Sequence, residues 1–371
     1  MSGAQASCLR CAGILPAVFD LNPNAINKIV VRAPNWVGDA VMSVAAFREL
    51  RSLFPNAHLT VVSKPGTSDI FHDADFVDEV LVYERRGLSS VWQQVRAWKQ
   101  RRFDLALLFQ NAFEAAAISF LARVPRRIGY DTERRGFLLT HSVSSPSWKN
   151  ERHEIFYYLN LVGELARTLP GTQSAAPEPQ FQIAVSAERR EAARKILAAH
   201  ADADKPLVLL CPGSVNSRAK RWPPERYASL ADQLSEWGVT VALIGSPGEL
   251  EVSKQVLSLA RRPPVLLTGK TSVAEVTALI SIADVLVTND TGPAHIGAAV
   301  ETPTLVIFGP TNPLTTRPYG PAGEIIRHPP DCAPCMLRDC PIDHRCMTAI
   351  TPEEVFARTT QLIRRHEEVA V

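Results

Sequence analysis

The sequence lacks any apolar run near the roughly 20 residues that a helix needs to cross a bilayer. Near the N-terminus Pro16 interrupts a short apolar patch, so the long core of a signal peptide is absent too. Charge is nearly balanced, with 40 Lys and Arg against 38 Asp and Glu, and the net value of +2 excludes nucleic-acid binding driven by bulk charge. We therefore expect a cytoplasmic protein without a nucleic-acid partner.

Two nucleotide-binding signatures are also absent. No G-x-G-x-x-G joins a strand to a helix, which removes the main support for an NAD-dependent oxidoreductase. No G-x-x-x-x-G-K-[ST] occurs, which argues against a P-loop NTPase. A nucleotide can still bind, but a different phosphate site has to hold it.

Cysteine is scarce except in one segment. Four of the seven cysteines lie close together, at Cys332, Cys335, Cys340 and Cys346. A disulfide framework is not expected in a large cytosolic protein. The C-x-x-C pair has the spacing of metal ligands, but the following C-x5-C spacing is looser than in a zinc ribbon. We favour a structural loop with reduced thiols, with a four-thiolate metal site as the alternative.

The sequence is rich in short apolar runs that alternate with amphipathic stretches. We expect residues 1–26 to be a loose extension and residues 27–170 to form an N-terminal domain. Its expected strands are 28–33, 58–63, 78–83 and 103–109, and its expected helices are 39–54, 66–72, 88–101 and 112–121. This rhythm predicts an α/β fold with a doubly wound parallel sheet.

The alternation of expected strands and helices is interrupted by a linker rich in Pro, Gly, Ser and Ala, which we place at 171–181. It resumes in a second domain at 182–351. The expected strands of this domain are 206–211, 239–245, 264–268, 283–289 and 302–309. A last helix, 352–371, is expected to pack back toward the N-terminal domain. Two such sheets leave a cleft, and ligands bind beyond the carboxyl ends of their strands.

Three motifs follow expected strands. In the first, RAPNWVGDAVMS (32–43), Asp39 stands where a helix opens. An N-cap is the simpler interpretation, since a carboxylate accepts from free backbone N–H groups there. The alternative is a general base that faces the cleft, because an ordinary Asp is ionised at neutral pH. A helix start would stabilise the charged form and weaken such a base. From spacing alone the cap is favoured.

The second motif is CPGSVNSRAKRWPP (211–224). Gly213 and Ser214 offer backbone and hydroxyl donors, and Lys220 and Arg221 offer positive charge. Such a loop can hold a pyrophosphate and neutralise it as it leaves. The alternative is a solvated basic loop.

The third motif is VTNDTGPAHIGAAV (287–300). Asp290 or Thr291 is expected to cap a helix, and Gly292 lets a ligand approach the backbone closely. Free N–H groups at the helix start form an anion site. His295, one turn inside, is either structural or a donor to a phosphate oxygen.

Two Asp-x-Asp triplets resemble the metal-binding pattern of some nucleotide-sugar enzymes. Asp73 and Asp75 form the first triplet, and Asp202 and Asp204 form the second. Both precede expected strands, at the end of the sheet away from the cleft. We interpret them as solvated turns.

Taken together, the three motifs and FGPTNPLTTRPYGP (308–321) with the following cysteine segment resemble the lipopolysaccharide heptosyltransferases of glycosyltransferase family 9. The resemblance covers about residues 27–366. It implies a GT-B fold, with two facing doubly wound domains. It also implies inverting transfer of heptose from ADP-L-glycero-D-manno-heptose to the first heptose of the lipopolysaccharide inner core. It further implies that no metal is required, and we expect no other cofactor.

The resemblance also implies residue roles. Asp39 becomes the candidate base, overturning the preference for a cap alone. Lys220 contacts phosphate, with Ser214 and Arg221 beside it. The remaining donor-site residues are Gly38, Asp290, Thr291, Gly292 and His295, with Glu249 at the adenosine end and Glu251 as its competitor.

The implied acceptor is a lipid A–core oligosaccharide at the inner face of the cytoplasmic membrane. The basic clusters at 84–87, 99–102, 123–127 and 132–136 then suggest peripheral contact of the N-terminal domain with an anionic surface. Their alternative role is solubility. Two other functions stay open: a family 9 enzyme with another acceptor or donor sugar, and a non-catalytic nucleotide-sugar binding protein.

Overall fold

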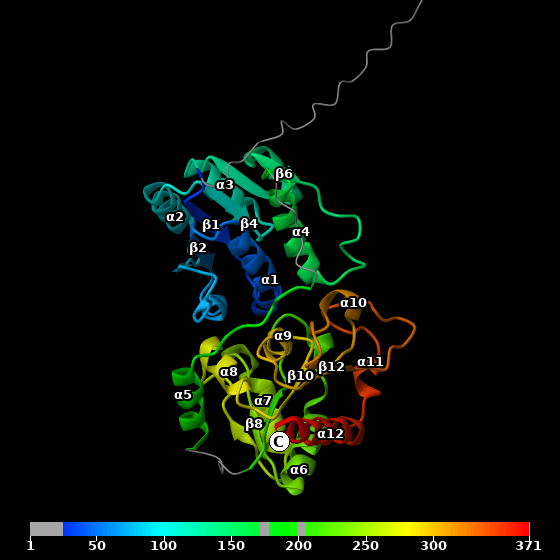
Figure 1. Cartoon of the computed structure of the whole chain (residues 1–371). Helices are drawn as coiled ribbons and strands as arrows, with labels where there is room; N and C mark the ends of the chain where they lie inside the picture. The colour runs from blue at the N-terminus through cyan, green and yellow to red at the C-terminus, as the bar shows by residue number, and fades with distance from the viewer. Residues whose placement is uncertain (1–24, 171–177, 199–204, 371) are drawn as a thin grey trace, which may run out of the picture.

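The computed structural model describes residues 25–170, 178–198 and 205–370, arranged as two domains (Figure 1). Each domain holds a six-stranded sheet, in the orders β3-β2-β1-β4-β5-β6 and β12-β11-β10-β7-β8-β9. All strand pairs are parallel. The prediction of two doubly wound parallel sheets is therefore confirmed.

The N-terminal sheet consists of β1 (Lys28–Arg32), β2 (His58–Ser63), β3 (Glu79–Val82), β4 (Leu105–Leu108), β5 (Arg126–Tyr130) and β6 (His141–Val143). Its helices are α1 (Val37–Leu53), α2 (Leu88–Arg101), α3 (Phe113–Leu121) and α4 (Glu154–Ala166), with the 3-10 turns η2 (Thr67–Phe71), η3 (Thr132–Arg134) and η4 (Gly136–Leu138). Val30 packs into the apolar cluster under α2 and α3, and its neighbour Val31 packs into the one under α1 and α4. Successive residues of β1 thus bury both faces of the sheet.

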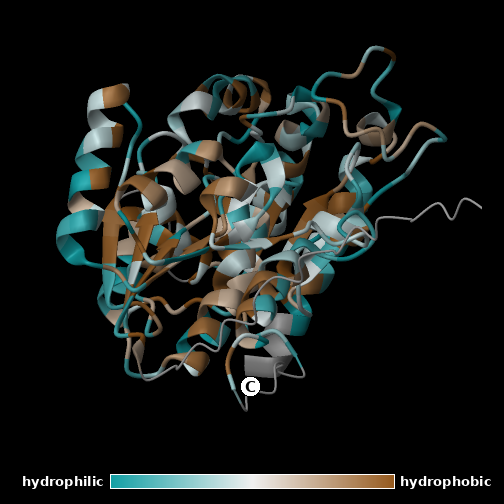
Figure 2. Ribbon diagram, turned by 90° about the horizontal axis from the view of Figure 1, so that it is seen from above, coloured by the Kyte–Doolittle hydropathy of each residue, from teal (hydrophilic) through white to brown (hydrophobic). Residues whose placement is uncertain are grey.

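The C-terminal sheet consists of β7 (Leu207–Cys211), β8 (Thr240–Leu243), β9 (Val265–Leu266), β10 (Val285–Asn289), β11 (Thr304–Ile307) and β12 (Gly323–Ile326). Its helical segments are α5 (Ala187–Ala198), η5 (Arg218–Lys220), α6 (Pro224–Trp237), η6 (Pro247–Glu249), α7 (Leu250–Leu259), α8 (Val273–Ile280), α9 (Gly292–Ala299), α10 (Pro313–Thr316), α11 (Arg345–Thr348) and α12 (Pro352–Ala370). Figure 2 shows the apolar strands enclosed between helices. None of the helices in the described residues is long and apolar enough to span a membrane.

One apolar cluster joins the two domains. It contains buried side chains of α1 and α4 together with those of α8 and α9. Phe181, the last residue of the expected linker, and Ile183 and Val185, which follow it, belong to the same cluster. The Ile183 N–H also donates to the Ala299 carbonyl at 3.0 Å. Burying this shared apolar surface holds the inner helices of the two domains together.

The last helix differs from the prediction. Val355, Leu362 and Ile363 of α12 are buried in the cluster formed with α6 in the C-terminal domain. Arg365 pairs with Glu324 at 3.0 Å, just after the start of β12. The expectation that this helix packs toward the N-terminal domain is therefore wrong. Its apolar stripe covers the outer face of its own domain's sheet.

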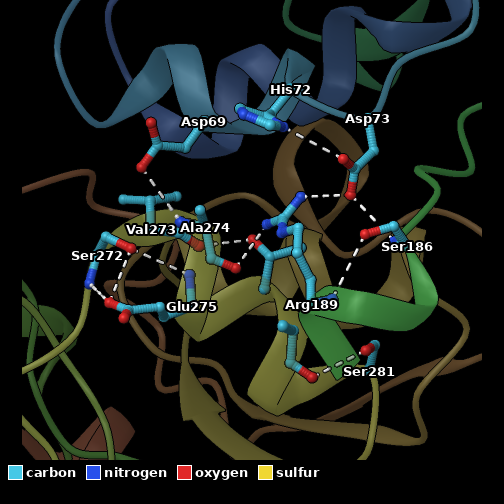
Figure 3. A network of polar contacts seen from close by, with 12 residues as sticks. Asp69, His72, Asp73, Ser186, Arg189, Ser272, Val273, Ala274, Glu275 and Ser281 are labelled. Carbon is cyan, nitrogen blue, oxygen red and sulfur yellow. Dashed lines mark hydrogen bonds and ion pairs between the residues drawn. The ribbon is translucent and has the colours of Figure 1, made fainter. Parts of the chain in front are cut away.

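A polar network also connects the domains (Figure 3). Asp69 accepts from the Ala274 N–H at 3.2 Å, in the first turn of α8. Asp73 accepts from the Ser186 N–H at 3.0 Å and from Arg189 at 2.7 Å. Arg189 in turn donates to the Ala274 carbonyl at 2.6 Å. Two N-terminal-domain carboxylates therefore satisfy helix starts of the other domain.

This network corrects the interpretation of Asp73 as a solvated turn residue, since its side chain is only 17% exposed. Asp75 does lie at the surface, where it pairs with Arg48 at 3.1 Å. Asp202 and Asp204 lie outside the described residues.

Candidate active site

A cavity of about 650 Å³ lies between the domains. The turn after β1 and the start of α1 form one wall, and the turns after β7, β8 and β10 form the other. Nine of the ten residues that the sequence nominates line it: Gly38, Asp39, Ser214, Lys220, Glu249, Asp290, Thr291, Gly292 and His295. They meet because each follows a strand whose carboxyl end points into the cleft.

The starts of α1 and α9 approach each other closely at this cavity. A Cβ atom on Gly38 would lie 2.8 Å from His295 Cδ2, and one on Gly292 would lie 3.1 Å from Val37 Cβ. Within the described residues no side chain caps either helix. Backbone N–H groups and the positive ends of two helix dipoles thus converge on one space, which favours a bound anion such as a diphosphate.

Asp39 is not the helix cap. Trp36 is the N-cap of α1, and Asp39 is the third residue of the helix. Burial raises the pKa of Asp39, while the hydrogen bond from Tyr158 at 3.3 Å and the charges of Lys220 and Lys149 offset this only in part. Burial thus outweighs the stabilisation of the carboxylate expected from its place at a helix start. A raised pKa suits a general base.

Three residues beside Asp39 were missed by sequence reasoning. Tyr158 and Glu154 lie on α4, and Lys149 lies in the preceding loop. Burial raises the pKa of Glu154 to about 7, with the charge of Lys149 lowering it and that of Asp39 raising it. Tyr158 and Asp39 are 119 positions apart, and only the packing of α4 on α1 brings them together. No local sequence signal reports such a contact.

On the opposite wall Lys220 pairs with Asp290. The Lys220 ammonium donates to Asp290 Oδ2 at 2.9 Å and to the Asp290 carbonyl at 3.1 Å. The Thr311 hydroxyl, which the sequence did not single out, donates to the same Oδ2 at 2.6 Å. Asp290 therefore positions the cation, and one of the three ammonium N–H donors remains for a ligand.

Arg221 differs from its predicted role. Its guanidinium donates to the Ser214 carbonyl at 3.1 and 2.8 Å, and it does not line the cavity. Arg221 thus fixes the loop that carries Ser214. The phosphate contact predicted for it has no support in this geometry, because adjacent residues of the turn point in different directions.

The structure also separates the two acidic candidates for the nucleotide end. Glu249 lines the cavity and caps its own turn, accepting from the Ser246 N–H and hydroxyl, both at 2.8 Å. A Cβ atom on Gly213 would lie 2.2 Å from Glu249 Oε1, so this carboxylate rests on the backbone of the Gly213 turn. Glu251 is exposed and outside the cavity. Glu249 is the better-placed candidate.

The cysteine segment is hydrogen-bonded to the loop that carries Lys220. The Ala219 N–H donates to the Arg338 carbonyl at 2.9 Å, and His344 bonds the Ala219 carbonyl at 2.6 Å. All cysteines of the described residues are free, and in that part of the chain no group of three or more His, Cys, Asp or Glu side chains is arranged to hold a metal. The hydrogen bonds to Ala219 support a structural role for this segment.

His295 is neutral at pH 7, because burial lowers its pKa from 6.5 to about 4. Between these values the unfolded chain binds a proton that the folded chain does not, so stability falls as pH falls.

We expect a loss of about 2 kcal/mol between pH 7 and 5 from this residue. His295→Asn should flatten urea-midpoint profiles over that range. His72→Asn, on a side chain 72% exposed, is the control. A profile unchanged by His295→Asn would contradict the assignment.

Gly38→Ala is expected to impair activity more than stability. The added methyl group meets His295 Cδ2 at 2.8 Å and forces α1 and α9 apart where the two domains meet. A misplacement of about 1 Å can cost about 10²-fold in rate. In Gly248→Ala the new Cβ would meet only Ser246 Oγ, at 3.9 Å, so this variant serves as the control in steady-state assays and melting curves. Wild-type kcat in Gly38→Ala would show that the close approach is dispensable.

Comparisons with known proteins identify the family of the chain. The sequence model of glycosyltransferase family 9 (heptosyltransferase) matches residues 90–345. Lipopolysaccharide heptosyltransferase 2 of Salmonella typhimurium is 29% identical over 320 residues, which cover 81% of this chain and 88% of that protein. The protein of that name from Escherichia coli K12 is 27% identical over 359 residues, covering 92% and 99%.

The solved structure of E. coli ADP-heptose LPS heptosyltransferase II matches with a TM-score of 0.78 at 26% identity, covering 92% of this chain and 99% of that one. The match confirms the GT-B arrangement of two facing doubly wound domains. Since the family model spans well over half of the chain, the protein belongs to glycosyltransferase family 9, the heptosyltransferases.

Proposed function

We propose that this enzyme transfers L-glycero-D-manno-heptose from ADP-heptose to the first heptose of the lipopolysaccharide inner core, with inversion at the anomeric carbon. One observation carries the proposal. A half-buried carboxylate, Asp39, faces the same cavity as the cation Lys220, between two uncapped helix starts. The relatives named above are lipopolysaccharide heptosyltransferases by name, and the name of the E. coli structure includes ADP-heptose.

On the acceptor side Asp39 accepts the proton of the attacking hydroxyl. Burial has raised its pKa, so its affinity for that proton is higher than that of an ordinary carboxylate. Tyr158 fixes one carboxylate oxygen by its hydrogen bond at 3.3 Å and leaves the other for the acceptor. The N-terminal domain, which supplies all of these groups, binds the acceptor.

On the donor side the departing ADP gathers negative charge on its diphosphate. Lys220, Ser214 and the first turn of α9 at Thr291 and Gly292 stabilise that charge, and neutral His295 donates one further hydrogen bond. Preorganised donors of this kind contribute about 2.7–4 kcal/mol each in acyl transfer, and the same order applies here. Glu249 binds the adenosine end. These groups supply the electrostatics of leaving-group departure, so the proposed reaction requires no metal.

The acceptor is lipid-anchored, so the enzyme works in the cytoplasm with peripheral contact at the inner face of the cytoplasmic membrane. Catalysis itself needs only the saccharide part of the acceptor inside the cavity. A delipidated acceptor therefore tests the chemistry apart from membrane contact.

The deciding experiment measures ADP release from ADP-heptose with a water-soluble, delipidated acceptor that ends in one heptose, in EDTA. Acceptor-dependent release, with the new linkage identified by NMR, is the expected result. Tight donor binding with no release would assign another acceptor to the enzyme. Release with a different nucleotide sugar but not with ADP-heptose would change the donor. Binding of the donor without turnover on any acceptor would leave a non-catalytic nucleotide-sugar binding protein.

A further inference from the structure

Exposed apolar side chains gather on one part of the N-terminal domain. Seven of the fifteen large apolar side chains that are exposed in the described residues belong to residues 82–137. We call six of them, with the surface between them, the α2–α3 face: Leu88, Trp92, Phe113, Phe120, Leu121 and Phe137. Leu88 and Phe137 are 74% and 75% exposed, values that ordinary folding does not favour for such residues.

These residues lie on neighbouring elements. Helices α2 and α3 pack side by side, and α3 also contacts η4 (Figure 1). The rings of Phe113 and Phe137 are 6.2 Å apart. On α2, Leu88 and Trp92 are four residues apart, so they share a stripe that continues to Arg96 and Lys99. The apolar side chains therefore lie on adjoining elements that cover the same side of the sheet.

The charge of this face is positive. Between residues 82 and 137, seven Lys and Arg residues are exposed against three Asp and Glu residues. Other cations of the basic clusters serve the fold: Arg101 pairs with Glu79 at 2.9 Å, and Arg135 is fully buried on backbone carbonyls. The exposed set includes Arg96, Lys99, Arg102, Arg123 and Arg134. Part of the predicted basic surface thus remains for a partner.

A chain of contacts connects helix α3 with the wall of the active-site cavity. Tyr83, at the end of β3, donates its hydroxyl to Glu114 of α3 at 2.9 Å. Its ring lies 5.8 Å from the guanidinium of Arg32, which donates to Asn35 at 2.9 Å. The next residue, Trp36, lines the cavity and is 56% exposed. A surface bound to this face would lie next to the cavity mouth.

We infer that the α2–α3 face docks the enzyme on an anionic lipid bilayer, with its apolar side chains in the headgroup region and its cations on lipid phosphates. This rests on the proposed function, because a lipid-anchored acceptor requires the active site to work at a membrane surface. Aromatic side chains suit the boundary between water and acyl chains, and arginine and lysine suit anionic headgroups. A second copy of this positive face would repel it, so charge complementarity favours lipid.

Co-sedimentation with phosphatidylcholine vesicles, with and without 30 mol% phosphatidylglycerol, tests the charge requirement. Each cation near an anionic surface contributes about fivefold to partitioning, so the triple variant Arg96→Glu, Lys99→Glu, Arg102→Glu should bind at least about 100-fold more weakly. The matched control reverses three exposed charges of α5 in the other domain: Arg190→Glu, Arg194→Glu and Lys195→Glu. Equal losses of vesicle binding in both triple variants would overturn the inference, because net charge alone would then explain the binding.

Fluorescence quenching by brominated acyl chains tests insertion directly. Trp92 is 53% exposed on the face, and Trp237, 38% exposed on the C-terminal domain, is the comparison. Because Trp36 is also exposed, at the cavity mouth, both variants are made in a Trp36→Phe background. Quenching should disappear when Trp92→Phe is added and persist when Trp237→Phe is added. Quenching that survives Trp92→Phe in this background would overturn the inference.

Turnover of the water-soluble acceptor separates this inference from the proposed function. The triple variant on α2 should keep wild-type kcat on that acceptor while losing turnover of acceptor embedded in vesicles. Failure of the wild type on the soluble acceptor would instead count against the proposed function, whatever the vesicle result.

Discussion

Asp39→Asn is expected to lower kcat by about 10²–10⁴-fold, while the affinity for ADP-heptose stays within about twofold of wild type. The amide keeps the size of the side chain but cannot accept the proton of the acceptor hydroxyl. Donor binding depends on the other wall of the cavity, where Lys220 and the start of α9 lie. Calorimetric titration with ADP-heptose and single-turnover heptosyl transfer measure the two quantities separately.

Tyr158→Phe is a milder change at the same site. It removes the hydrogen bond at 3.3 Å from the Asp39 carboxylate but keeps the carboxylate, so we expect a loss of about tenfold or less. Asp75→Asn, on an N-terminal-domain side chain 74% exposed, should change nothing. Turnover in Asp39→Asn within tenfold of wild type would remove Asp39 from the role of base and leave it a structural acidic residue of α1.

The pH profile gives an independent readout of the same residue. Because burial raises the pKa of Asp39 above its ordinary value of 3.8, kcat should fall with decreasing pH at a higher pH than for an exposed aspartate. The base is active only when deprotonated, so activity is present above the raised pKa and lost below it. The residual activity of Asp39→Asn should not show this decrease of kcat at acid pH.

The sequence predicts the sheets and much of the site for a single physical reason. Strands β1, β7 and β10 are apolar runs, each followed directly by residues that suit a ligand rather than a core. Parallel strands bring such residues to one edge, so Asp39, Lys220 and His295 could be placed together before any contact was known. Strand β5 and the edge strand β6 were not predicted, because β5 begins with two arginines and β6 has only three residues.

Directions of side chains and distant partners could not be predicted. Lys220 and Arg221 are neighbours of equal charge, yet one points to Asp290 and the other to the Ser214 carbonyl. Helix α1 begins two residues before the expected start, which moves Asp39 from the cap into the first turn. These outcomes depend on backbone register and on packing between α1 and α4. Local propensity determines neither of them.

Lys220→Met is expected to lower kcat by about 10²–10³-fold, because it removes a preorganised cation from the site where the diphosphate of the leaving group gathers charge. The variant also removes the partner of buried Asp290, which leaves that carboxylate with the Thr311 hydroxyl. We therefore expect a loss of stability of about 1–3 kcal/mol as well. Single-turnover transfer rates and urea midpoints measure the two effects.

The double variant Lys220→Met, Asp290→Asn separates chemistry from folding. Replacing the buried carboxylate with a neutral amide removes the uncompensated charge, so most of the lost stability should return. The transfer rate should not return, since no cation faces the leaving group. If the rate recovers together with stability, Lys220 acts only by holding Asp290 and the turn before α9. If stability recovers alone, the ion pair serves to aim an ammonium at the diphosphate, and Asp290 contributes to catalysis only through the position of Lys220.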